Sequence, residues 1–204
     1  MTRGAWLAAG LLVLAAAWLG PLPAMSRHSF AAHMTMHVSV IAIAVPLLAL
    51  GIRGSLRDPV RRFPRLFSPI PASLLELVVV WAWHAPLLHH LARESNAMLV
   101  LEQSSFFLAG MLVWLSSFGG SRMHQRERAM AGVAGLLLTS MHMTLLGVLL
   151  ALADRPLYAH AGESTDQQLG GVIMLCVGGT AYLFGALYRV HDLLRERHNA
   201  VSPG

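Results

Sequence analysis

Lysine is absent from this sequence of 204 residues, cysteine occurs once, and charged residues make up only 12% of the chain. A soluble domain usually has about a quarter of its residues charged, so this shortage excludes an ordinary water-soluble domain. A single cysteine excludes a disulfide framework within the chain. Because Cys176 falls inside a hydrophobic run, we expect a buried, structural thiol there.

The sequence also lacks the short motifs of common enzymes. It has no P-loop, no glycine pattern of a dinucleotide-binding fold, and no arrangement that suggests a nucleophile with its base. We therefore expect a protein that is not an enzyme.

Hydrophobic residues, in contrast, make up 55% of the chain, and the mean hydropathy is +0.57. A hydrophobic run of about 18 residues or more can cross a bilayer as a helix. The sequence has six such runs, at residues 5–24, 30–52, 72–92, 97–118, 129–153 and 167–189. They leave no room for a soluble domain, so we predict a single all-α domain over residues 1–204, a polytopic transmembrane bundle of about six spans.

Arginine is distributed unevenly among the connections. Most arginines lie after the second and fourth runs and in the tail: Arg53, Arg57, Arg61, Arg62, Arg65, Arg122, Arg126, Arg128, Arg189, Arg195 and Arg197. Short loops rich in basic residues stay on the cytoplasmic side. We therefore predict cytoplasmic termini, with loops near residues 25–29, 93–96 and 154–166 outside. The arginines form no contiguous basic face, which argues against nucleic acid as a partner.

The first run allows a second interpretation. Residues 1–26 have a basic start, an apolar core and small residues near Ala24, as a signal peptide has. The apolar stretch is long enough to span, however, and no clear A-x-A site follows it. We favour a retained helix; cleavage would leave five spans and move no other loop.

Polar and sulfur-containing side chains gather near the predicted outer ends of five runs. The candidates for a site in this layer are His33, His37, Met34, Met36, His84, Glu102, Met141, His142, Met143 and Met174. Ionisable groups at membrane depth are costly and usually face the bundle interior, where they mark a functional site. The inner halves of the runs carry almost no polar or sulfur-containing side chains. This asymmetry between the two halves is the main functional indication in the sequence.

The residue types in this layer favour copper. His33 and His37 are four residues apart and share one helical face, and Met34 and Met36 flank that face. Thioethers select Cu(I) over hard cations. Carboxylates are scarce, which argues against calcium, magnesium or manganese. Zinc held by histidines and Glu102 stays possible, although no HExxH motif is present.

Other polar residues have simpler interpretations. His28, His89, His90 and His160 are expected to be wetted at the membrane interface, and His124, His191 and His198 to be solvated on the cytoplasmic side. The glycines at 170, 171, 178 and 179 are expected to permit close helix packing. Asp166 is expected to cap the N-terminus of the last helix.

The sequence resembles the CtaG-type cytochrome c oxidase assembly proteins of bacterial membranes. The resemblance covers about residues 28–189 and rests on "HSFAAHMTMH", "WHAPLL", "LEQSSFFLAGMLVW", "MHMTLLGVLLALADRPLY" and "DQQLGGVIM". It implies a multi-pass protein of the bacterial inner membrane that helps to mature haem–copper oxidases by supplying copper. It further implies cytochrome c oxidase subunits as partners, a periplasmic copper donor, ligand roles for His33, His37, His84 and His142, and positions for Asp166 and Gln167 at the outer entrance.

Two segments depart from the pattern of that family. Many members have Glu-His where this chain has Glu102-Gln103, so one possible ligand is missing. Many also have Met-Trp-Val-Pro-Gly-Gly where residues 174–179 read "MLCVGG". Without the proline we expect a straighter last helix.

Three other functions stay open. Paired histidines on neighbouring helices can ligate a haem iron, which would make the chain a membrane redox protein. A copper transporter would need ligands through the full thickness of the membrane, which the inner halves lack. A scaffold for oxidase assembly would need no metal.

Overall fold

The computed structural model describes residues 2–56, 58–120, 125–158 and 164–201, and every regular element in them is helical. The elements are α1 (Arg3–Leu19), α2 (Leu22–Met25), α3 (Phe30–Val38), η1 (Ser39–Ala44), α4 (Val45–Ile52), α5 (Pro59–Arg62), α6 (Pro69–Trp83), α7 (Pro86–Glu94), α8 (Asn96–Phe118), α9 (Gln125–Ala151), α10 (Ser164–Ile173), η2 (Met174–Gly179) and α11 (Thr180–Val201). The all-α prediction is confirmed for this part of the chain.

Four continuous helices in the described residues are long and apolar enough to cross a membrane: Phe30–Ile52, Asn96–Phe118, Glu127–Ala151 and Ser164–Arg195. The bent pair α6–α7 makes a fifth if it is counted as one span. The structure thus has four or five candidate spans where the sequence predicted six. The first predicted run is interrupted, because α1 ends after 17 residues at Leu19 and Gly20 and Pro21 follow it.

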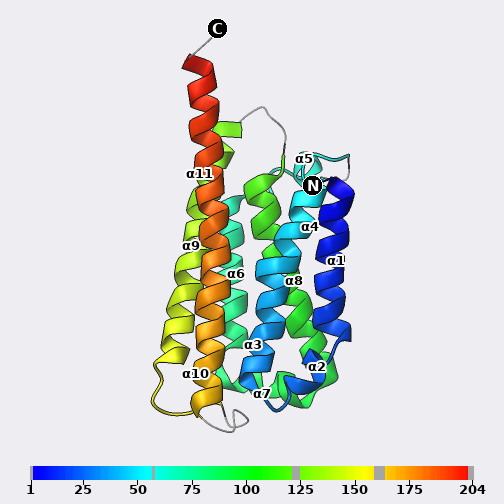
Figure 1. Cartoon of the computed structure of the whole chain (residues 1–204), viewed down its shortest axis with the longest axis vertical. Helices are drawn as coiled ribbons and strands as arrows, with labels where there is room; N and C mark the ends of the chain where they lie inside the picture. Colours follow the sequence, from blue (N-terminus) through cyan, green and yellow to red (C-terminus); the bar gives the residue numbers. More distant parts are fainter. Residues whose placement is uncertain (1, 57, 121–124, 159–163, 202–204) are drawn as a thin grey trace.

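The predicted run 72–92 is not one straight helix. It is bent by 71° between Trp83 and Pro86. A proline disfavours helical backbone in the residue before it, and Ala85 is accordingly extended, with φ −66° and ψ 134°. The helix α7 therefore lies across one end of the bundle (Figure 1), and His84 occupies the break.

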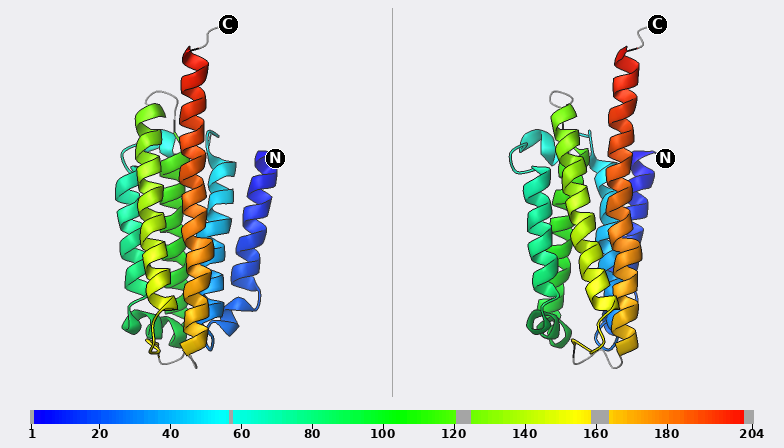
Figure 2. Two further views of the ribbon diagram at one scale, coloured as in Figure 1. Left: turned by 60° about the vertical axis from the view of Figure 1, so that its left-hand side comes forward. Right: turned by 90° about the vertical axis from the view of Figure 1, so that its left-hand side faces the viewer.

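The helices run along one long axis, with the start of α1 and the end of α11 at the same end (Figures 1 and 2). We call this the arginine end, because α5 with Arg61 and Arg62 lies there. Arg3 donates to the Gly54 carbonyl at 3.2 Å, which ties the first helix to that end. The opposite end, with α2, α7 and the starts of α3 and α10, we call the histidine end. Arg57, Arg122, His124 and His160 lie outside the described residues, as do the side chains of Arg126, Arg197 and His198.

Glycine permits the close approach of α9 and α10, as predicted. A Cβ on Gly171 would lie 2.4 Å from the backbone nitrogen of Ala151 and 2.8 Å from the carbonyl oxygen of Gly147. Gly170 permits a close approach of α10 to a different helix, α3, because a Cβ on Gly170 would lie 2.4 Å from the ring of Phe30. At Gly178, in contrast, the nearest atom would be 3.8 Å away, so close packing does not require a glycine at that position.

The last span contains a π-helical turn at Met174–Gly179, so the missing proline did not leave a regular α-helix there. A second π-helical turn, Ser39–Ala44, lies in the span that begins at Phe30. Cys176 is exposed on the outer face of η2. The prediction of a buried thiol is therefore wrong: Met174 of the same turn faces the bundle interior, and Cys176 faces outward.

Candidate metal centre

The histidine end holds a buried group of ionisable side chains that we call the histidine cluster. Its members come from α3, the break after α6, α7 and α8: His33, His37, His84, His89, Arg93 and Glu102. None of the six is more than 6% exposed. The structure thus brings together four of the residues that the sequence singled out, and adds two that it did not.

The start of α3 is held in place by Asp166. The Asp166 carboxylate accepts hydrogen bonds from the Phe30 amide at 2.5 Å, the Ala31 amide at 3.3 Å and the Ser29 hydroxyl at 2.9 Å. Free backbone N–H groups at a helix start need such acceptors. The prediction that Asp166 caps its own helix is wrong: it lies in the first turn of α10 and caps α3 instead. His33 and His37 follow on the inner face of α3.

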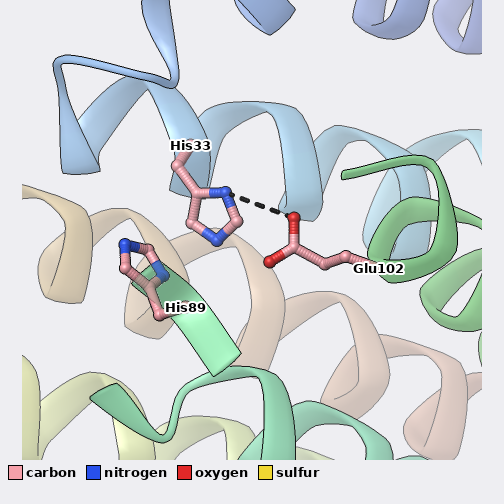
Figure 3. Close-up of side chains that lie close together, drawn as sticks. All are labelled: His33, His89 and Glu102. Carbon is pink, nitrogen blue, oxygen red and sulfur yellow. Dashed lines mark ion pairs between the residues drawn. The ribbon is translucent and has the colours of Figure 1, made fainter. Parts of the chain in front are cut away.

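His33, His89 and Glu102 form one group with metal-site dimensions, since a ligand atom from each lies within 4.8 Å of the others (Figure 3). Arg93, however, reaches into this group. Its Nη2 lies 2.5 Å from Oε2 of Glu102, and its Nη1 donates at 2.7 Å to Nδ1 of His33. A neutral His33 that accepts at Nδ1 carries its proton on Nε2. In this arrangement the guanidinium, a permanent cation, stands where a metal would bind.

His37 and His84 form a second group, with ring centroids 5.6 Å apart. Nδ1 of His84 lies 2.6 Å from the Val80 carbonyl oxygen, to which it donates. Its proton is thereby assigned to Nδ1, and the lone pair of Nε2 is available. That Nε2 and both ring nitrogens of His37 are buried and have no hydrogen-bond partner among the described residues.

Tyr158 packs on the histidine cluster from the connection after α9. Its ring lies 4.3 Å from that of His89 and 4.7 Å from that of Phe30, and its hydroxyl donates to the His84 carbonyl at 2.8 Å. Burial raises the pKa of the Tyr158 hydroxyl, so the group stays a donor at neutral pH. The contact anchors the backbone at the break that presents the His84 ring.

Sequence reasoning missed His89 and Arg93. His89 was expected to be wetted, but it is 3% exposed and its ring lies 4.9 Å from that of His33. Both residues lie on the buried face of α7, which Pro86 turns across the end of the bundle. The sequence did contain an indication, because Pro86 follows His84 by two residues and predicts a helix boundary there.

Other predicted site residues do not join the histidine cluster. His142 is buried with no hydrogen-bond partner in the described residues, and no ring contact there links it to the cluster. Met141 is 68% exposed on the outer face of α9, so it points away from the bundle interior. The remaining predicted methionines, Met34, Met36, Met143 and Met174, are fully buried.

Gln103, the residue that departs from the family pattern, connects the cluster to α1. Its amide nitrogen lies 3.4 Å from Oε2 of Glu102, and its oxygen accepts from the Trp18 indole at 3.3 Å. The side chain thus orients Glu102.

The prediction that the inner halves of the helices carry almost no polar side chains is wrong. Ser73, Glu76, Thr139 and Tyr182 are all completely buried on α6, α9 and α11. Ser73 lies 11 residues before His84, about 16 Å along the helix toward the arginine end. Glu76 was not among the predicted site residues, because it stands alone in an otherwise apolar run.

Comparison with known proteins identifies a family. The model of the family described as "Cytochrome c oxidase caa3 assembly factor (Caa3_CtaG)" matches residues 1–196. No similar protein was found among curated proteins, and no similar fold among solved structures.

Proposed function

The chain belongs to the Caa3_CtaG family of cytochrome c oxidase caa3 assembly factors, and on that premise we propose that it carries Cu(I) at the histidine end and assists its insertion into a haem–copper oxidase. Membership of the family implies association with an oxidase and a non-enzymatic role. The copper, its ligands and the direction of transfer are our proposal.

The observation that carries the proposal is the pair His37 and His84. A buried nitrogen without a partner costs about 1–3 kcal/mol in a folded protein. The two rings retain three such nitrogens between them, and a metal ion would use the lone pairs. The bond from His84 to the Val80 carbonyl is the arrangement by which proteins orient a ligating imidazole.

Neutral imidazoles in an apolar setting suit a soft monovalent ion. Binding Cu(I) between His37 and His84 would add one positive charge to the cluster. The Arg93–Glu102 pair is already balanced, so the charge would not fall beside an unpaired cation. A site of few ligands also suits a cargo that must leave again, because ligands of an oxidase subunit can replace the histidines one at a time.

We place the chain in the bacterial inner membrane, with the arginine end cytoplasmic and the histidine end outward. The distribution of arginine supports this orientation. In this position Cu(I) would arrive from a periplasmic donor and pass to a cytochrome c oxidase subunit in the same bilayer.

The packing of the rings supports copper over haem. The His37 ring lies 4.0 Å from that of Phe106 and 5.6 Å from that of His84. The Phe106 ring that packs against His37 fills space that a porphyrin bound to this imidazole would need. Ser73, Glu76, Thr139 and Tyr182, which lie toward the arginine end, offer only oxygen atoms. Oxygen atoms are poor ligands for Cu(I), so these residues do not support a copper path across the bundle.

The proposal is tested by Cu(I) binding to purified protein under reducing conditions, in competition with a chromophoric chelator. We expect His37→Ala and His84→Ala each to weaken Cu(I) affinity by roughly ten- to a hundredfold. His191→Ala, an exposed histidine on α11, is the matched control and should bind as the wild type does.

A deletion strain gives the cellular test. Under copper limitation it should assemble oxidase with less than its full copper, and His84→Ala should not restore it. Loss of a haem absorption band in His37→Ala, with copper binding unchanged, would establish the haem protein instead. If the wild-type protein binds neither group and His37→Ala supports full assembly, the chain acts as a metal-free scaffold.

A further inference from the structure

A second group of buried polar residues lies outside the histidine cluster. We call Ser73, Glu76, Thr139 and Tyr182 the glutamate site. Its members come from three helices, α6, α9 and α11, and all four have no exposed surface. Ionisable groups inside a membrane bundle are costly and usually have a function. The proposed copper chemistry uses none of these residues.

The hydroxyl groups of the glutamate site converge on one carboxyl group. The Tyr182 hydroxyl donates to Oε1 of Glu76, and the Thr139 hydroxyl lies near that carboxyl group. The Ser73 and Thr139 hydroxyl oxygens are 2.8 Å apart. Oε2 of Glu76, in contrast, is buried with no hydrogen-bond partner in the part of the chain that the structure describes.

Two backbone features lie close to this carboxyl group. Gly110 of α8 faces it, and a Cβ built on that glycine would lie 3.5 Å from Oε1 of Glu76. Tyr182 lies three residues after the end of the π-helical turn Met174–Gly179. Such turns are frequent at functional sites. The carboxyl group is thus bound by the Tyr182 hydroxyl, and Gly110 of α8 packs against it.

Glu76 has no basic partner in the described part of the chain. None of the ion pairs in the described residues involves it, and the sequence contains no lysine. A buried carboxylate without a counterion costs several kcal/mol, so the site holds either a proton on the carboxyl group or a cation that the chain does not supply.

We propose that the glutamate site binds Na⁺, coordinated by Oε2 of Glu76 together with the Ser73 and Thr139 hydroxyl oxygens. Oxygen ligands suit hard cations, not Cu(I). One carboxylate neutralises one monovalent ion, whereas Ca²⁺ or Mg²⁺ would leave a net positive charge in an apolar interior. The Tyr182 hydroxyl keeps Oε1 engaged and directs Oε2 toward the ion. The protein therefore carries two cation sites of opposite chemistry, nitrogen at one end and oxygen within the bundle.

The test measures ²²Na⁺ binding to purified protein and its thermal stability in NaCl against choline chloride at equal ionic strength. The wild type should bind Na⁺ saturably and unfold at a higher temperature in NaCl. Glu76→Gln should lose both effects, and Thr139→Val, which removes one oxygen ligand without changing the shape, should weaken Na⁺ binding by roughly ten- to a hundredfold. Glu127→Gln, an exposed carboxyl on α9, should behave as the wild type.

Failure of this proposal is separable from failure of the copper proposal, because His37→Ala should keep Na⁺ binding intact. If Glu76→Gln does not fold, Na⁺ binding is measured in Thr139→Val and Tyr182→Phe instead. Unchanged Na⁺ binding in all of these variants, or no Na⁺ binding in the wild type, overturns the proposal. So does labelling of Glu76 by a hydrophobic carbodiimide at neutral pH without protection by NaCl, since the carboxyl then holds a proton in place of the ion.

Discussion

The guanidinium of Arg93 joins Glu102 and His33, with Nη2 at 2.5 Å from the carboxylate Oε2 and Nη1 at 2.7 Å from the imidazole Nδ1. The Arg93–Glu102 ion pair is buried, with Arg93 on α7 and Glu102 on α8, so it links the helix that lies across the bundle end to a spanning helix. The Arg93 guanidinium also donates to Nδ1 of His33, so the lone pair of that nitrogen is not available to a metal. For this reason we propose His37 and His84, and not His33, as the copper ligands.

Removing Arg93 should destabilise the bundle strongly. Arg93→Met leaves Glu102 as an unpaired buried carboxylate, which we expect to lower the free energy of unfolding by about 3–5 kcal/mol. Adding Glu102→Gln to Arg93→Met removes the unpaired carboxylate charge. The double variant should therefore recover most of the lost free energy of unfolding. Reversible unfolding in mixed detergent micelles measures both. A double variant no more stable than Arg93→Met would show that the two residues are not coupled.

The close approach of α9 and α10 predicts a difference between two glycines of the last span. Gly171→Ala places a Cβ against the backbone of Ala151 and should cost about 1–3 kcal/mol through overpacking. Gly178→Ala meets its nearest atom at 3.8 Å and should be neutral or slightly stabilising, because alanine favours helix. Thermal unfolding of the two variants checks this. Equal losses would contradict the glycine contact.

Asp166 should control the start of α3. Asp166→Ala removes the acceptor for the Phe30 and Ala31 amides and should cost about 1–2 kcal/mol. Hydrogen exchange at these amides should become faster, while Asp166→Asn, which keeps an acceptor oxygen, should show a smaller change. Asp154→Ala, at an exposed position, is the control. Unchanged exchange at Phe30 in Asp166→Ala would rule out the cap.

The orientation in the membrane can be tested with two exposed leucines at opposite ends. Leu56 is 99% exposed at the arginine end, and Leu157 is 50% exposed at the histidine end. In a Cys176→Ala background, a membrane-impermeant maleimide should label Leu157→Cys in intact cells and Leu56→Cys only after permeabilisation. Labelling of Leu56→Cys in intact cells, and of Leu157→Cys only after permeabilisation, would show that the protein has the opposite orientation.

Much of the helical layout was predictable from the sequence, because lipid as a solvent demands long apolar runs whose backbone hydrogen bonds are satisfied internally. The runs at 30–52 and 97–118 agree closely with the structure. The run at 72–92 was mispredicted as one helix, since apolar composition does not reveal the bend that Pro86 causes. The grouping of His33, His37, His84 and Glu102 was predicted from their depth in the helices, but depth does not say which side chains face each other.

Composition and periodicity alone therefore determined that this chain is an all-helical membrane protein with a histidine-rich end and arginine-rich connections. Those properties follow from how each segment interacts with lipid or water, one segment at a time. Tertiary structure decided the rest. It brought Arg93 into the predicted metal layer and buried His89 by turning α7. It left both ring nitrogens of His37 and Nε2 of His84 without a hydrogen-bond partner among the described residues, and it grouped Glu76 with hydroxyl-bearing side chains of α9 and α11. The physical reason is that hydrogen bonding and charge neutralisation depend on distances between side chains on different helices, and those distances arise only when the helices pack.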